Sequence, residues 1–238
     1  MDAILYSTLA GISTVLGVVV VYIFGRPKQK MLSTLLGFAG GVMLAISLFE
    51  LLPEAIEFGS VSHLVIGLAL GGAVMFLLDN FVPHHHFTKG SEDGSVLRLG
   101  YLVTLGIALH NLPEGFAIGA GLEANPALSL YIAISIGLHN IPEGIATTAP
   151  LSGGGLSWLK IALLNLGAGM MTPVGTILGL LFFNLSPGLV GMGLAFAAGA
   201  MIYIVLDELL PESYKYSLSF GNAGLVTGIF LGYLLFMA

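Results

Sequence analysis

The chain has 238 residues, of which 56% are hydrophobic and only 8% are charged, and its mean hydropathy is +0.99. Soluble domains carry about 25% charged residues, so this composition excludes a soluble globular protein and indicates an all-α, polytopic membrane protein. The formal net charge is −6. We expect no nucleic-acid partner. The absence of cysteine excludes disulfides and thiolate ligands, so any metal must be held by nitrogen, oxygen or thioether groups.

Apolar stretches long enough to cross a bilayer as helices, about 20 residues each, recur along the whole chain. We predict eight transmembrane helices, at residues 3–24, 31–52, 62–82, 97–121, 127–149, 157–183, 189–210 and 218–238. The first stretch has no clear cleavage site, so we expect a transmembrane helix there and not a cleaved signal. Residues 1–238 would thus form a single transmembrane domain, with a histidine-bearing loop at about 83–96.

The basic residues predict the orientation of these helices. All seven lie in or beside the odd-numbered connections: Arg26, Lys28, Lys30, Lys89, Arg98, Lys160 and Lys215. By the positive-inside rule these connections are cytoplasmic, so both termini would be extracytoplasmic. The acidic residues Glu54, Glu57 and Glu123 would then lie outside, where they favour cations over anions.

An internal repeat supports this topology. Residues 37–43 (GFAGGVM) resemble residues 195–201 (AFAAGAM), and residues 49–54 (FELLPE) resemble residues 207–212 (DELLPE). The two stretches lie in predicted helices two and seven, which cross the membrane in opposite directions. Such inverted repeats are typical of secondary transporters, and they predict a division of the helices into three, two and three.

A polar cassette occurs twice within the apolar spans, as His110-Asn111-Leu112-Pro113-Glu114-Gly115 and as His139-Asn140-Ile141-Pro142-Glu143-Gly144. Ionisable side chains are costly in the bilayer core and are rare there unless they have a function. The spacing of 29 residues allows one helix to cross, turn and return beside the first. We therefore expect the two cassettes to meet near the middle of the membrane.

Each cassette offers a histidine and a glutamate four residues apart, which share one helix face. The two prolines lack the N–H that would bond the carbonyls of Leu109 and Leu138, so each helix should bend there and expose polar backbone. Nitrogen and oxygen ligands without sulfur suit Zn²⁺, and also Fe²⁺, Mn²⁺ or Cd²⁺. The candidate metal ligands are His110, Asn111, Glu114, His139, Asn140 and Glu143.

Two further groups are weaker candidates for exit or regulatory contacts. The run His84-His85-His86 lies in the predicted cytoplasmic loop, where exposed histidines are also tolerated without a function. Asp207 and Glu208 lie near the cytoplasmic end of predicted helix seven, and a structural role is the simpler interpretation for them.

These residues resemble the ZIP family of divalent metal transporters, in particular its bacterial zinc-uptake and GufA-like branches. The resemblance rests on the eight spans, the histidine loop and the paired cassettes, and it covers essentially the whole chain. It implies Zn²⁺ uptake into the cytoplasm across a bacterial or archaeal plasma membrane by alternating access. It also implies a transport bundle of helices one, four, five and six that moves against a scaffold of the others, and it is compatible with a homodimer.

One feature departs from that family pattern. Relatives often carry a glutamate just before a proline in the sixth span, whereas this chain has Met170-Met171-Thr172-Pro173. Some relatives also carry aspartate at the position of Asn140. This departure leads us to expect one strong metal site, centred on His110, Glu114, His139 and Glu143, with any second site weak.

Two other classes of function are compatible with the same side chains. A membrane-embedded metallohydrolase would use a His and carboxylate centre, but the His-Glu-x-x-His signature is absent, and a diiron desaturase needs more than the six histidines present. A proton-coupled carrier of organic solutes would use the carboxylates as proton relays without metal. We expect a transporter with no catalytic cofactor, and not an enzyme.

Overall fold

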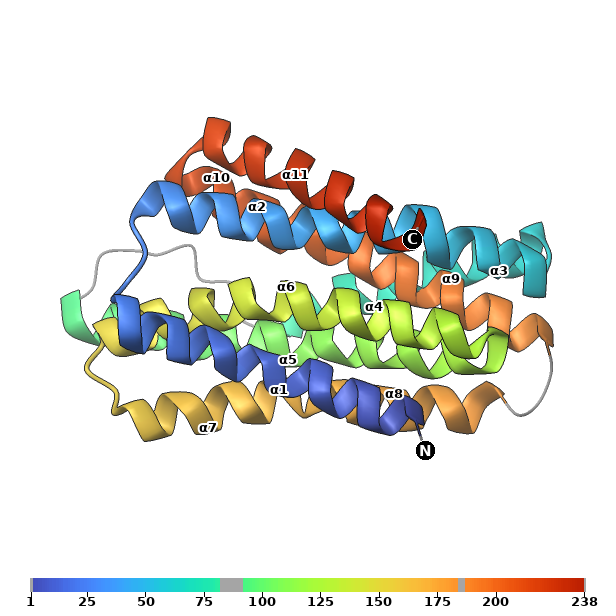
Figure 1. The fold of residues 1–238 in the computed structure, drawn as a ribbon, viewed down its shortest axis with the longest axis horizontal. Helices are drawn as coiled ribbons and strands as arrows, with labels where there is room; N and C mark the ends of the chain where they lie inside the picture. The colour runs from blue at the N-terminus through green and yellow to red at the C-terminus, as the bar shows by residue number, and fades with distance from the viewer. Residues whose placement is uncertain (1, 82–91, 184–186, 238) are drawn as a thin grey trace.

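The computed structural model describes residues 2–81, 92–183 and 187–237, and all regular structure in these ranges is helical. The helices form eight rods, two of which include a π-helical segment (η) and one of which is interrupted by a turn (Figure 1). In chain order they are α1 (Asp2–Phe24); α2 (Gln29–Ala45), η1 (Ile46–Leu51) and α3 (Leu52–Phe58); α4 (Val61–Phe81); α5 (Glu92–Ala124); α6 (Pro126–Gly153); α7 (Trp158–Gly169) and α8 (Met171–Phe183); α9 (Pro187–Ile204), η2 (Val205–Leu209) and α10 (Leu210–Tyr216); and α11 (Leu218–Met237).

The prediction of an all-α, polytopic membrane protein is confirmed. Four of the rods are long and apolar enough to span a bilayer, at residues 2–24, 29–58, 158–181 and 187–216. Among the residues that the structure describes, α5 and α6, which carry the polar cassettes, do not meet the same length and hydropathy conditions. Both nevertheless continue as helices through Pro113 and Pro142.

The two π-helical segments occupy equivalent places in the repeat. Each segment ends two residues before a proline, Pro53 or Pro211. In each, the residue before the proline donates its backbone N–H to the carbonyl five residues earlier, from Leu52 to Ser47 and from Leu210 to Val205. A proline cannot supply the next helical hydrogen bond, so the ladder shifts register just before it. The same local sequence has therefore produced the same backbone irregularity in both halves.

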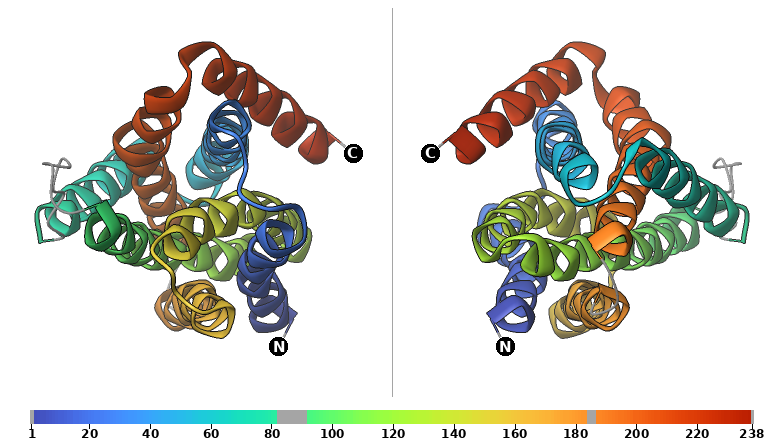
Figure 2. Two further views of the ribbon diagram at one scale, coloured as in Figure 1. Left: turned by 90° about the vertical axis from the view of Figure 1, so that its left-hand side faces the viewer. Right: turned by 90° about the vertical axis from the view of Figure 1, so that its right-hand side faces the viewer.

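The rods form two groups that pack through small residues. One group is a bundle of α1, α5, α6 and the α7–α8 rod, in which α1 packs on α6 and α8 packs on α5. In the other group α2 packs on α11 and α4 packs on α9. The end views of Figure 2 show α5 and α6 at the centre, with α1 and α7 on one side of them and α2 and α11 on the other.

The structure extends the inverted repeat from one helix pair to three. Residues 10–17 (AGISTVLG) of α1 match residues 168–175 (AGMMTPVG) of the α7–α8 rod, with the same spacing of 158 that relates Gly41 to Gly199. Gly41 packs on Leu225 of α11, and Gly199 packs on Leu68 of α4 in the same way. The chain is thus three rods, the α5–α6 pair, and three rods that repeat the first three.

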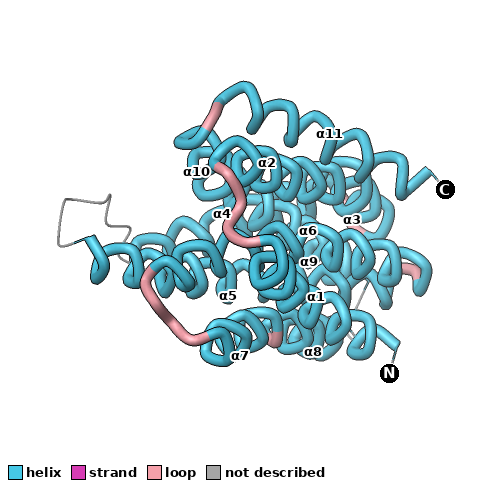
Figure 3. The backbone as a smooth tube through the Cα atoms, turned by 60° about the vertical axis from the view of Figure 1, so that its left-hand side comes forward, coloured by secondary structure: helices cyan, strands magenta, loops and turns pink. Residues whose placement is uncertain are grey.

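The described connections between the rods are short, and Figure 3 draws them in pink. In Figure 1 the connections at 25–28 and 154–157 lie at the left-hand end, while the N-terminus and the α5–α6 connection lie at the right. The predicted histidine loop falls largely on residues 82–91, outside the described residues.

Candidate metal site

The two cassettes meet in the centre of the bundle, between α5 and α6. The carboxylates of Glu114 and Glu143 and the imidazole of His139 each offer an atom within 4.8 Å of the others. All three side chains are completely buried. Hence the tertiary structure brings together residues that lie 25 and 29 positions apart in the sequence.

The closest pair in this cluster crosses between the two helices. His139 Nε2 lies 2.8 Å from Glu114 Oε1, which is a hydrogen bond, and 4.0 Å from Glu143 Oε1 on its own helix. The shorter distance requires one proton between the imidazole and the carboxylate. A metal ion with an imidazole and a carboxylate as ligands would take the place of that proton.

The two asparagines of the cassettes anchor α5 and α6 to the neighbouring rods. Asn111 donates a hydrogen bond from Nδ2 to the Ala168 carbonyl of α7, and Asn140 donates from Nδ2 to the Ala10 carbonyl of α1, both at 2.9 Å. Both side chains are buried, and neither Oδ1 has a hydrogen-bond partner among the described residues. Each amide group is therefore oriented, with its nitrogen used for structure and its oxygen available to a ligand.

Glycines next to the carboxylates allow the rods to approach closely. A Cβ at Gly144 would collide with the carbonyl of Thr14 in α1, and a Cβ at Gly115 would collide with the carbonyl of Thr172 in α8. Gly115 and Gly144 directly follow Glu114 and Glu143 in the sequence. The small residue that ends each cassette thus holds α8 and α1 against the site.

Not all of the candidate residues are placed in this cluster. The side chain of His110 and the residues His84-His85-His86 lie outside the described part of the structure. Glu208 in η2 is half-buried, and its carboxylate faces Gly106 of α5. A Cβ placed on Gly106 would lie 3.4 Å from Glu208 Oε2. Gly106 precedes Glu114 by eight residues, or about 12 Å of helix.

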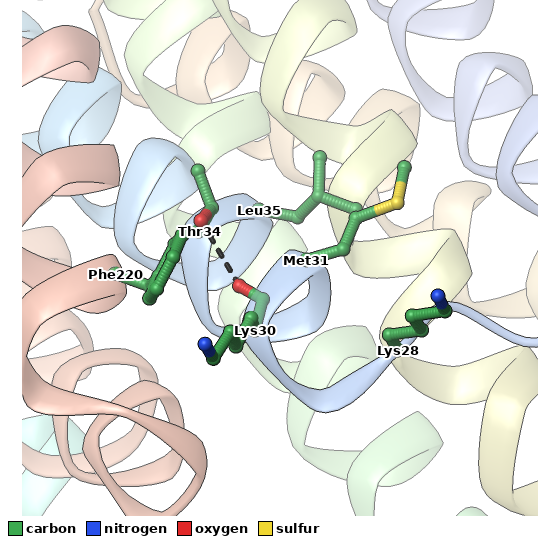
Figure 4. A pocket seen from close by; sticks show the side chains of 6 residues that line it. All are labelled: Lys28, Lys30, Met31, Thr34, Leu35 and Phe220. Atoms are coloured by element: carbon green, nitrogen blue, oxygen red, sulfur yellow. Dashed lines mark hydrogen bonds between the residues drawn. The ribbon is translucent and has the colours of Figure 1, made fainter.

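A separate cavity lies between α2 and α11, and Figure 4 shows the side chains that line it. Its volume is about 450 Å³, and its lining is Lys28, Lys30, Met31, Thr34, Leu35 and Phe220. Lys30 stacks over the Phe220 ring, 5.1 Å from its centroid. Two ammonium groups and no carboxylate or imidazole make this cavity unsuitable for a cation, so the cluster between α5 and α6 is the candidate site.

A buried cluster of two carboxylates and an imidazole, in a membrane protein built from an inverted repeat, defines a metal-handling class of transport protein. Comparison with known proteins identifies the family. The sequence profile of the family described as ZIP zinc transporter matches residues 85–238. The chain belongs to this family.

Similar proteins cover nearly the whole chain. It is 36% identical to the zinc transporter GufA of Myxococcus xanthus over 221 aligned positions, covering 88% of this chain and 87% of the relative. It is 36% identical to the zinc transporter ZupT of Chlorobaculum parvum over 266 aligned positions, covering 100% of this chain and 97% of the relative. It is 38% identical to ZupT of Akkermansia muciniphila over 237 positions, covering 89% and 87%. The expectation of a transporter and not an enzyme is confirmed by these relatives.

Sequence reasoning found the cassettes but missed what surrounds them. It did not identify the carbonyls of Ala10 and Ala168, which orient the asparagines, or the hydroxyl of Thr14. The signal was present in the repeat of Ala-Gly-x-x-Thr-x-x-Gly at residues 10–17 and 168–175. That repeat pairs the first rod with the sixth, as the longer match pairs the second with the seventh.

Proposed function

We propose that this protein carries divalent transition-metal cations, chiefly Zn²⁺, across the plasma membrane into the cytoplasm. One observation carries this proposal: three completely buried ionisable side chains converge within 4.8 Å between α5 and α6. The family membership and the names of the relatives support the same substrate. Cd²⁺, Fe²⁺ and Mn²⁺ have compatible ligand preferences and are expected to compete with Zn²⁺.

The ligands we propose for the ion are His110, Asn111, Glu114, His139, Asn140 and Glu143. Burying two carboxylates without a compensating charge is strongly unfavourable, and a divalent cation neutralises both. Zinc bonds of about 2.0–2.2 Å in tetrahedral geometry hold two ligand atoms roughly 3.4 Å apart. The 2.8 Å between His139 and Glu114 need therefore open only slightly as the ion replaces the shared proton.

The transport cycle follows from the same change in charge. An acidic outer mouth attracts the hydrated cation, which loses water as it binds the carboxylates and neutral imidazoles. Because the bound ion neutralises the site, the bundle of α1, α5, α6 and α7–α8 can move it through the low-dielectric interior. An empty, charged site would meet a higher barrier to the same movement. On the cytoplasmic side, water or protons displace the metal. No catalytic cofactor takes part in this cycle.

We place both termini outside the cytoplasm. The support is that the connections at 25–28 and 154–157, which contain or adjoin basic residues in the sequence, lie at the same end of the molecule in Figure 1. A second copy of the chain is the protein partner that we propose, because the family resemblance is compatible with a homodimer. The large apolar side chains exposed over α1, α4 and α11 suit contact with lipid or with that second copy.

The decisive experiment measures Zn²⁺ uptake into proteoliposomes with a fluorescent reporter inside. The double variant Glu114→Ala/Glu143→Ala should lose uptake while its circular dichroism and elution volume stay those of the wild type. Glu212→Ala is the matched control, because Glu212 is a glutamate outside the site that pairs with Lys215 at 2.6 Å. Uptake that survives in the double variant would refute the assignment of the site. Retained metal in the purified protein distinguishes a metal carrier from a carrier of organic solutes.

A further inference from the structure

Two buried threonines, Thr14 in α1 and Thr172 in α8, flank the metal site from equivalent positions of the repeat. The main-chain carbonyl of Thr14 lies against Gly144, next to Glu143, and that of Thr172 lies against Gly115, next to Glu114. Both side chains are completely buried. Among the described residues, neither hydroxyl has a hydrogen-bond partner.

Most threonines in the described helices have a hydrogen-bond partner. A threonine in a helix commonly donates its hydroxyl to the carbonyl four residues earlier. Five threonines of the described helices do so: Thr8, Thr34, Thr104, Thr176 and Thr227. For Thr14 and Thr172 the corresponding carbonyls are those of Ala10 and Ala168.

Those two carbonyls are the ones that receive the cassette asparagines. Asn140 donates to Ala10, which also accepts the hydroxyl of Ser13 at 2.6 Å, and Asn111 donates to Ala168. The asparagine amides, together with the Ser13 hydroxyl at Ala10, compete with the threonine hydroxyls for the same two carbonyl oxygens. The asparagines thus take the usual acceptors of the two threonines and leave their hydroxyls available.

The buried, unpartnered state of each hydroxyl suggests a ligand, and a hydrated cation is one that it could serve. Polar groups buried without partners are rare in folded proteins, and each requires an explanation such as an ion or an ordered water. A metal-bound water is a strong hydrogen-bond donor, while a neutral hydroxyl is a weak direct ligand of Zn²⁺ but a good acceptor for that water. Thr14 and Thr172 occupy equivalent positions in the two halves of the inverted repeat. Such a symmetric pair fits an ion that enters from one side of the membrane and leaves from the other.

We propose that the Thr14 and Thr172 hydroxyls accept hydrogen bonds from the water ligands that the divalent cation retains while it passes the Glu114–His139–Glu143 cluster. This role rests on the proposed transport function and deepens it. It gives the cassette asparagines two roles, because they anchor α5 and α6 and also occupy the carbonyls to which the two threonine hydroxyls would otherwise donate.

The test measures KM and kcat for Zn²⁺ uptake into proteoliposomes by the full-length protein. Thr14→Val and Thr172→Val remove only the hydroxyl at nearly constant volume, and each should raise KM about three- to tenfold, the effect of one lost hydrogen bond. Thr14→Ser and Thr172→Ser, which keep the hydroxyl, should restore the wild-type KM. Thermal stability should not fall in the valine variants, since the lost hydroxyl has no partner in the protein.

Thr148→Val is the matched control, because its hydroxyl is also buried and without a partner but lies in α6, outside the matched repeat. An unchanged KM in the Thr14 and Thr172 variants, an effect at only one of the two, or an equal effect at Thr148 would each overturn the proposal. These outcomes leave the transport function intact as long as the wild type takes up Zn²⁺ and the Glu114/Glu143 double variant does not. A wild type that takes up no Zn²⁺ would overturn both proposals.

Discussion

His139 Nε2 and Glu114 Oε1 share a hydrogen bond of 2.8 Å across the interface between α6 and α5, with no water-accessible surface on either side chain. This contact links the two cassettes directly and places a proton where a metal ion would bind. Replacement of the carboxylate by its neutral isostere therefore separates the role of charge from the role of shape.

We expect Glu114→Gln to preserve the fold and to weaken Zn²⁺ binding by at least about tenfold, which corresponds to about 1.4 kcal/mol. The amide oxygen can still accept the hydrogen bond from His139, but it cannot neutralise the charge of the ion. Isothermal titration calorimetry of the detergent-solubilised protein measures the affinity. Wild-type affinity in this variant would show that Glu114 is not a ligand.

A second prediction concerns the hydrogen bond from Asn140 to the Ala10 carbonyl. In Asn140→Asp an ionised carboxylate would face that carbonyl without a donor, so the metal-free protein should lose about 1–3 kcal/mol of stability. Thermal unfolding checks this, and added Zn²⁺ should recover part of the loss because it binds only the folded state.

The control for this prediction is Asn222→Asp. Asn222 uses its oxygen, as the acceptor of the Tyr214 hydroxyl at 2.8 Å, and aspartate can still accept that bond. Stability should therefore change little there. An equal loss at both positions would contradict the role assigned to the Asn140 amide.

The contact between Gly11 of α1 and Gly169 of α7 supports a third prediction. A Cβ on either glycine would overlap the carbonyl oxygen of the other. Gly169→Ala should therefore separate the two rods, lower stability by about 1–3 kcal/mol and impair transport. Thermal unfolding and proteoliposome uptake measure the two effects.

Gly167 in the same helix offers the comparison, because no atom lies within 4 Å of a Cβ placed there. Gly167→Ala should be neutral or stabilising by up to about 1 kcal/mol, through helix propensity alone. If the two alanine variants behaved alike, close packing of α1 on α7 would not be what the glycines provide.

The stoichiometry of metal binding is the fourth prediction. Asn140 and Thr172 are neutral, so a second ion near the cluster would meet less negative charge than the first. We expect one tightly bound Zn²⁺ per chain, with any second ion bound much more weakly. Calorimetric titration, or anomalous diffraction from crystals with Zn²⁺, would count against this if it found two sites of equal affinity and full occupancy.

The sequence by itself determined the class of the protein and the chemistry of its site. Apolar stretches of membrane-spanning length are a one-dimensional property, because each helix satisfies its own backbone in lipid. The cassettes were equally visible, because ionisable residues are conspicuous in an apolar span. The repeat of 49–54 at 207–212 predicted related halves, and the π-helical segments before Pro53 and Pro211 show that like sequence folded alike.

Only the tertiary structure decided which side chains meet and which hydrogen bonds they keep. The pairing of His139 with Glu114 and the capture of the Ala10 and Ala168 carbonyls by asparagines depend on helix rotation and on approach distances set by glycines far apart in the chain. Sequence spacing places a residue on a helix face, but the partner of that face is chosen by packing between helices. For the same reason the hydroxyl of Thr14 could be recognised as available only once its usual acceptor was seen to be occupied.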